Sequence, residues 1–373
     1  MGKAKTSRPI PGGLKPYWGR PLSEFVQLPP PPMDDGLKER HRLYSLLLMA
    51  LVRSQMNGNK YGSSGDYGKW RLKQQVAQLP SGTYLYEGGS YFGHNIAALA
   101  VDANGRVIDF DFNHNELFNS SVEHAESRLI RRLFTLTDLM ANFETRPAAR
   151  SGNVRSSAAG RDHPPALGLT FAISRPPMAE AQATGAPSFS RQSYATMLTD
   201  VTVYTSLESC AQCSGIMCLA DIREVAYLQF DNGQFFVGNI MYKATSSPRD
   251  PFRSPFPLAA DAFDFEHYDR LNTANTSFAS AVAKAPFFKG PTGVRNTPSI
   301  TSFLCTDAAL DIYEQATQEF LGVTKLSSPG YRRPARDGQV PETALTNAEV
   351  LTDVRQFREY ALAEGRRGTP HRV

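Results

Sequence analysis

The sequence predicts an α/β protein with a five-stranded mixed sheet and helices on both faces. Runs of β-rich sequence alternate along the chain with segments whose apolar residues recur at helical spacing. Two of these runs are separated only by Ala103-Asn104-Gly105, which suits a tight antiparallel hairpin. Helices separate the later strands from one another, and connections of that kind place neighbouring strands parallel. Together these observations predict a mixed sheet.

The first half of the chain is predicted to form a helix, the hairpin and a second helix. Apolar residues at helical spacing predict the first helix from residue 37 to about residue 55. The β-rich runs 95–102 and 106–112 are the hairpin strands. In 120–144 the apolar residues step by three and four positions in one continuous stripe, which predicts the second helix. Residues 146–195 are rich in Arg, Pro, Ala, Gly and Ser, and we expect a flexible insertion there.

The third and fourth strands are expected on either side of a short helix. The runs 200–206 and 224–230 contain the β-branched and aromatic residues typical of buried strands. Between them, 210–222 has the composition of a short helix.

After a Pro-rich stretch, the pattern predicts a helix at 263–284 and the fifth strand at 299–305. A helix in that position would make the fifth strand parallel to the fourth. Helices are also predicted at 307–322 and 347–363.

These elements suggest one domain with extensions at both ends. Residues 1–36 hold a Pro run and are expected to form an extended arm. The domain covers 37–325 and contains the insertion 146–195. Residues 326–373 are expected to be a loose tail that ends in a short helix.

Composition excludes several classes of protein. Hydrophobic residues make up 41% of the chain, so it is not wholly disordered. A net charge of +4 permits a nucleic-acid partner but is smaller than a dedicated binder requires. The chain has 4 cysteines in 373 residues, which excludes a disulfide scaffold. Three of them lie within 210–218, which suggests a metal site or a reactive pair in a reducing compartment. No apolar run approaches the roughly 20 residues that span a bilayer, so we expect a cytoplasmic protein with no membrane partner.

Two short motifs stand at the starts of two predicted helices, and each follows a strand. One is His124-Ala125-Glu126, and the other is Cys210-Ala211-Gln212-Cys213. Cysteines three apart at a helix start face the same way, and the helix N-terminus stabilises their thiolates. Two thiolates and one imidazole are three ligands, the number that a catalytic zinc takes from the protein. Glu126, two positions after His124, is placed to move protons as a general acid and base.

The alternatives for these residues are a structural zinc and a redox pair. A structural zinc needs a fourth ligand. Cys218 lies five residues after Cys213, about 140° around an ideal helix, and is therefore expected to face elsewhere. We favour a catalytic zinc, one ion per chain.

A His-x-Glu motif followed by Cys-x-x-Cys is the signature of zinc-dependent nucleobase deaminases. The chain therefore resembles the cytidine deaminase-like superfamily over roughly 37–325. Within that superfamily it resembles the tRNA-editing deaminases and poorly characterised bacterial deaminases. The resemblance implies that His124, Cys210 and Cys213 bind zinc and that Glu126 shuttles protons.

The resemblance also suggests substrate contacts. Asn113 lies at the end of the second strand, where tRNA adenosine deaminases place a substrate-contacting Asn, and Asn115 is the second candidate. Phe235 and Phe236 follow the fourth strand, where core packing is favoured over stacking on a base.

One residue departs from the family pattern. Pro usually precedes the first cysteine, and here the residue is Ser209. We expect Ser209 to cap the helix that follows, with Gln212 completing a capping box.

The predicted function is hydrolytic deamination of a cytosine or adenine base by zinc-activated water. The favoured substrate is a polynucleotide, either RNA or DNA, and the alternative is a free nucleoside, nucleotide or base. A second alternative is a catalytically idle deaminase-fold protein whose zinc only braces the fold. The choice of base and the oligomeric state are not determined by the sequence.

Overall fold

The computed structural model describes residues 19–21, 24, 26–55, 93–115, 118–134, 198–246, 253–284, 288–290, 293–295 and 299–364. The predicted insertion 146–195, most of the N-terminal arm and the second half of the predicted helix 120–144 lie outside these residues.

The described strands form one five-stranded sheet and a small hairpin. The sheet strands are β1 (Ala97–Val101), β2 (Val107–Phe112), β3 (Thr202–Thr205), β4 (Glu224–Tyr227) and β5 (Phe256–Ala259). Their spatial order is β2-β1-β3-β4-β5. β1 pairs antiparallel with β2 and β3, while β3–β4 and β4–β5 are parallel. The hairpin is formed by β6 (Phe288–Gly290) and β7 (Gly293–Arg295). The mixed five-stranded sheet and its parallel fifth strand are confirmed.

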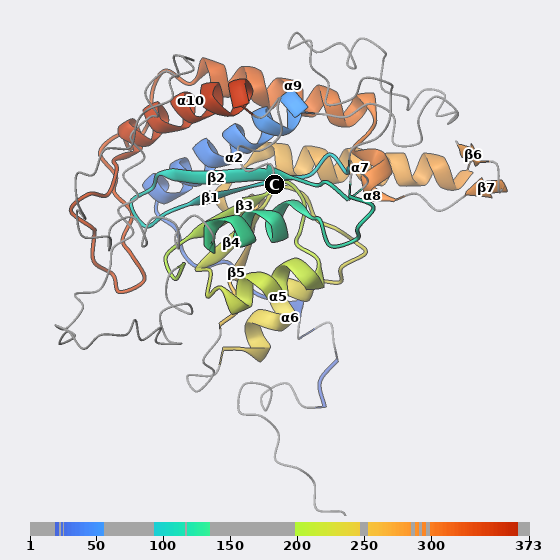
Figure 1. The fold of residues 1–373 in the computed structure, drawn as a ribbon, viewed down its shortest axis with the longest axis horizontal. Coiled ribbons are helices and arrows are strands. Elements are labelled where there is room, and N and C mark those ends of the chain that lie inside the picture. Colours follow the sequence, from blue (N-terminus) through green and yellow to red (C-terminus); the bar gives the residue numbers. More distant parts are fainter. Residues whose placement is uncertain are drawn as a thin grey trace, which may run out of the picture.

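Helices cover both faces of this sheet. The longer ones are α2 (Asp35–Gln55), α7 (Glu266–Lys284), α9 (Asp307–Gly322) and α10 (Asn347–Glu364), and the shorter ones are α5 (Ala211–Leu219), α6 (Val237–Ala244) and α8 (Ile300–Phe303). Residues 125–134 are also helical. Figure 1 shows α2, α9 and α10 on one face and α5 and α6 on the other. The predicted three-layer arrangement is therefore correct.

The core lies between the sheet and α2. Seven consecutive residues of this helix, 46–52, are buried, because α2 packs against the sheet on one side and against α9 and α10 on the other. A helix that is apolar around most of its circumference requires burial of this kind.

The fifth strand is not where its sequence pattern predicted it. Residues 299–305 contain the short helix α8 instead, and Ser299 caps it by accepting a hydrogen bond from the Ser302 amide. The fifth strand is the four-residue β5 at the edge of the sheet. Pro257 lies within it, and an edge strand tolerates a proline because one side of its backbone needs no partner.

The connection between the fourth and fifth strands is also different. The predicted helix 263–284 exists as α7, but it follows β5. The parallel crossover contains α6 instead, which packs on α5 and β5. The conclusion about strand direction is correct, although the helix used to reach it was the wrong one.

The segment predicted as a loose tail contacts the sheet. The Arg333 guanidinium bonds the Thr202 hydroxyl at 2.7 Å and the Glu224 carboxylate at 2.5 Å. Arg336 pairs with Asp221 at 3.0 Å. Farther along, α10 packs on α2 and β2. The domain boundary at residue 325 stays a prediction, but the described residues 326–364 lie against the domain.

Arg333 and Glu224 form a largely buried ion pair at the start of β4. Each side chain is 12% exposed. Burial alone would raise the pKa of Glu224, but the positive charges of Arg333 and Arg223 outweigh it and hold this pKa at about 2. The stabilisation is present above the ordinary carboxyl pKa of 4.5 and is lost as the pH falls from there towards 2.

Replacing Arg333 by Met is expected to lower the free energy of unfolding at pH 7 by about 3–5 kcal/mol, because Glu224 would remain buried without its partner. Urea unfolding measures this change. The double variant Arg333→Met/Glu224→Gln is the control, and it should recover most of the loss. Equal losses in the single and the double variant would mean that the buried charge is not the cause.

Among the described residues, no helix is both long enough and apolar enough to cross a membrane.

Candidate metal centre

The three predicted ligands come from the starts of two neighbouring helices. His124 immediately precedes the helix 125–134. The Asn113 side chain stabilises the start of this helix by accepting a hydrogen bond from the Ala125 amide at 2.7 Å. Cys210 is the N-cap residue of α5, with extended backbone angles, and Cys213 lies in the first turn. Both helix starts follow the ends of strands, so the sheet brings the two segments together.

The ligand atoms form one group. Cys210 Sγ lies 3.4 Å from His124 Nδ1, and Cys213 Sγ lies 3.6 Å from the same nitrogen. All three ligand atoms are within 4.8 Å of one another. Tetrahedral zinc with ordinary Zn–S and Zn–N bond lengths would separate a sulfur and a nitrogen by about 3.6 Å. The donor set and its spacing therefore fit a metal of the zinc type.

The environment favours a thiolate at Cys210. Its pKa is lowered to about 4, first by the hydrogen bond with Cys213 and then by the one with His124. The pKa of Cys213 is raised by its hydrogen bond with Cys210 and by burial. Since thiolates are the ligating form of cysteine, metal binding would release the proton of Cys213. Cys213 is fully buried, whereas His124 and Cys210 are partly exposed. The group is thus open on one side.

Glu126 lies directly beside this group and is 4% exposed. Its Oε2 atom is 3.4 Å from Cys213 Sγ. Its Oε1 atom accepts hydrogen bonds from Thr205 Oγ1 and Ser209 Oγ, both at 3.1 Å. Burial raises the pKa of Glu126, which brings the carboxyl closer to the range useful for proton transfer at neutral pH.

The two predicted substrate contacts are involved in local structure. Asn113 is buried, and its side-chain oxygen is used at the start of the helix 125–134. Asn115 Oδ1 accepts a hydrogen bond from the His94 amide at 3.3 Å. Their contact with a substrate stays a prediction.

The predicted helix cap at Ser209 is wrong. Cys210 is the N-cap residue of α5, and no side chain caps this helix. The Ser209 hydroxyl binds Glu126 instead, as does that of Thr205, and sequence reasoning assigned neither residue this contact. The only sequence signal was the departure of residue 209 from the family pattern.

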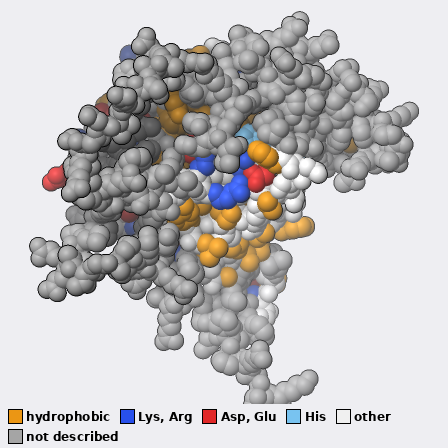
Figure 2. Space-filling model, in the orientation of Figure 1, with side chains coloured by type: hydrophobic (Ala, Val, Ile, Leu, Met, Phe, Trp, Pro, Cys, Tyr) orange, Lys and Arg blue, Asp and Glu red, His pale blue; other side chains and the backbone are white. Residues whose placement is uncertain are grey.

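The charges on the helix that follows His124 are balanced. On the face seen in Figure 2, Lys and Arg side chains lie against acidic and apolar ones near the centre. The arginines of the helix 125–134 are paired with carboxylates: Arg128 with Asp111 and Glu123, Arg131 with Glu123, and Arg132 with Asp109 and Asp111. These arginines therefore add little net positive potential.

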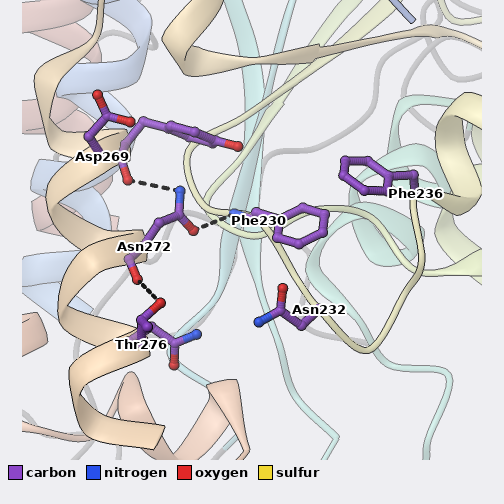
Figure 3. Close-up of a pocket in the computed structure, with 8 residues that line it drawn as sticks. Phe230, Asn232, Phe236, Asp269, Asn272 and Thr276 are labelled. Atoms are coloured by element: carbon purple, nitrogen blue, oxygen red, sulfur yellow. Dashed lines mark hydrogen bonds between the residues drawn. The ribbon is translucent and has the colours of Figure 1, made fainter. Parts of the chain in front are cut away.

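A pocket of about 290 Å³ lies between the loop after β4 and helix α7 (Figure 3). The loop contributes Phe230, Asn232 and Phe236, and α7 contributes Tyr268, Asp269, Asn272, Asn275 and Thr276. Asn272 links the two sides, because its side-chain oxygen accepts a hydrogen bond from the Phe230 amide at 3.1 Å. Aromatic rings and amides are the groups that recognise planar polar ligands.

This loop is anchored beside the metal group. The Asp231 amide donates to Glu208 Oε2 at 3.1 Å, and Glu208 is two residues before Cys210. Phe235 and Phe236 have φ values of 51° and 54°, a left-handed conformation that costs energy for bulky residues. The expectation that both pack in the core is wrong, because the residue surface of Phe235 is 72% exposed and Phe236 is only partly buried and lines the pocket. The strained backbone presents an aromatic ring to solvent.

No family model matches the chain, and no curated protein matches its sequence. A solved structure from work on A-to-I editing by tRNA:A34 deaminases at the wobble position of transfer RNA is similar to it. The similarity covers 44% of this chain and 82% of that chain, at 18% identity and a TM-score of 0.24.

Proposed function

We propose that this protein is a zinc-dependent hydrolytic deaminase that acts on the exocyclic amine of a cytosine or adenine base in a polynucleotide. The observation that supports this most directly is the placement of Glu126. Its carboxylate is 3.4 Å from Cys213 Sγ, beside a His-Cys-Cys group whose spacing fits zinc.

His124, Cys210 and Cys213 would hold the zinc ion. When bound, zinc supplies Lewis-acid activation of a water molecule, which is the source of the new oxygen. Glu126 would accept a proton from the attacking water and deliver protons to the ring nitrogen and to the departing amine. One water molecule is consumed, the C–N bond breaks, and the base gains a carbonyl while ammonia leaves.

The geometry favours this function over a structural zinc. Within the described part of the chain, the candidate ligand group consists of His124, Cys210 and Cys213, and Cys218 does not belong to it. Three protein ligands leave a fourth tetrahedral position open for water. A carboxylate buried beside a purely structural zinc would cost desolvation energy and would not strengthen metal binding.

The loop after β4 supports a polynucleotide as the substrate. Its pocket and the exposed Phe235 ring offer stacking surfaces next to the segment that contains Cys210. Single-stranded nucleic acids bind to such aromatic platforms, at about 1–3 kcal/mol for each stacked base. A free nucleoside would fill only the site at Glu126.

The test is ammonia release from a panel of bases, nucleosides, nucleotides, single-stranded DNA and single-stranded RNA. Protein loaded with zinc is compared with protein stripped by a chelator and with the stripped protein after zinc is restored. We expect zinc-dependent release that is fastest with one of the polynucleotides. Release that does not depend on zinc, or no release from any member of the panel, would refute the proposal.

Replacing Phe235 by Ser is expected to raise KM for the polynucleotide by about tenfold, because a stacking contact of about 1–3 kcal/mol is lost. KM for a free nucleoside should stay the same. Leu219→Ser is the matched control, since Leu219 is an apolar residue that is 60% exposed, at the end of α5. An equal effect of Phe235→Ser on both kinds of substrate would contradict a role in stacking.

A further inference from the structure

Two hydroxyl groups hold the same oxygen of Glu126. Thr205 Oγ1 and Ser209 Oγ both donate to Oε1 at 3.1 Å, while the other oxygen, Oε2, lies 3.4 Å from Cys213 Sγ. Thr205 is fully buried and Ser209 is 5% exposed, so water competes little for these bonds. The carboxylate therefore has two different ends, one bound by hydroxyls and the other facing the metal group.

This asymmetry determines where a proton can reside. A hydroxyl group has one proton to donate, and a carboxylate oxygen that accepts two such donors has no room for a proton of its own. As long as both hydroxyls donate to Oε1, Oε2 is therefore the oxygen open to a proton. Hydrogen bonds to a charged group are stronger than those between neutral groups, so they also fix the orientation of the side chain.

We propose that Ser209, together with Thr205, is a positioning residue that directs the proton shuttle of Glu126 through Oε2. This inference rests on the function proposed above. Both hydroxyls belong to the segment that supplies the cysteines: Thr205 is the last residue of β3, and Ser209 directly precedes Cys210. Glu126 belongs to the other helix. The two hydrogen bonds thus fix the carboxylate to the segment that holds two of the three metal ligands.

Ser209 is the more informative of the two residues. The family pattern has Pro at this position, and proline has no hydroxyl. The hydroxyl of Ser209 does not cap α5, since Cys210 is the N-cap residue and no side chain caps this helix. Its bond to Glu126 is therefore a property of this chain, beyond what the motif itself provides.

The first measurement is kinetic. Ser209→Ala is expected to lower kcat by about tenfold and to leave KM within about twofold, because it removes one hydrogen bond to a charged group without altering the surface that binds substrate. Ser209→Thr keeps the hydroxyl and should restore most of kcat. Thr202→Val is the matched control. Thr202 lies in the same strand as Thr205 and its hydroxyl binds another buried carboxylate, that of Glu224, at 3.1 Å. Its loss should leave kcat unchanged.

The second measurement needs no substrate. The infrared bands of the Glu126 carboxyl are obtained by subtracting the spectrum of Glu126→Gln from that of the wild type, both loaded with zinc. In the Ser209→Ala background the same subtraction should give a shifted carboxylate stretch, and in the Ser209→Thr background it should give the wild-type position. Zinc content is measured in every sample and should remain one ion per chain.

These two measurements separate failure of the positioning role from failure of the proposed function. A wild type without deaminase activity would refute the function, and the infrared shift would still report whether Ser209 holds the carboxylate. An unshifted band in the Ser209→Ala background would overturn the positioning role, even in an active enzyme. Loss of zinc from Ser209→Ala but not from Ser209→Thr would overturn it too, because Ser209 would then support the metal loop rather than Glu126.

Discussion

Replacing Glu126 by Gln is expected to lower the rate of deamination by at least about 10²–10⁴, the usual contribution of general acid–base catalysis. Zinc content should not change, because Glu126 is not in the ligand group. Stability should be equal or slightly higher, since burial raises the pKa of Glu126 and so disfavours the charge that the substitution removes. Gln has nearly the same shape and still accepts hydrogen bonds from Thr205 and Ser209. The rate with the best substrate, bound zinc and thermal unfolding are the three measurements.

Glu123→Gln is the control for loss of a negative charge near the site. Glu123 pairs with Arg128 and Arg131 and lies outside the ligand group. Its substitution should change the rate by no more than a few-fold. A Glu126→Gln variant that deaminates at the wild-type rate would rule out the mechanism. A variant that no longer binds zinc or no longer folds would assign Glu126 a structural role.

Replacing Cys213 by Ser is expected to abolish tight zinc binding and, with it, activity. Cys213 is fully buried and lies 3.6 Å from His124 Nδ1, and the substitution would replace its thiolate, an ordinary zinc ligand, by a neutral hydroxyl. Loss of an outer partner of a metal ligand already costs about 10–100-fold in affinity, and loss of the ligand itself should cost more. Zinc affinity is measured by competition with a chelator of known strength.

Cys218→Ser is the matched control, because Cys218 is buried in the same helix and lies outside the ligand group. It should change stability slightly and zinc affinity not at all. Equal losses of zinc affinity in both cysteine variants would mean that the helix, rather than the thiolate, determines binding. Full activity in a Cys213→Ser protein that contains no zinc would refute the assignment of the metal.

Local patterns predicted most of the fold because helices and hairpins depend on residues that are near in sequence. The apolar positions of 37–55 indicated a helix, and the structure has α2 at Asp35–Gln55. Ala103-Asn104-Gly105 indicated a tight turn, and Gly105 there has a φ of 87°. The fifth strand was missed because four residues at a sheet edge, one of them a proline, carry almost no periodic signal.

By itself, the sequence determined the α/β class and the hairpin, because these depend on residues that are near one another in the chain. It also supplied two short motifs whose order indicated His124, Cys210 and Cys213 as candidate ligands, and the structure brings these three side chains together. Only the tertiary structure decided what the side chains around them do. From the sequence, Ser209 could either cap its own helix or bind a carboxylate 83 positions away. In the fold it binds Glu126, because the sheet places the two helix starts side by side. The surroundings of two further residues also depend on the tertiary structure. Arg333 pairs with the buried carboxylate of Glu224, and a strained loop exposes Phe235 to solvent. Polar partners depend on distances across the fold, which residue patterns along the chain do not encode.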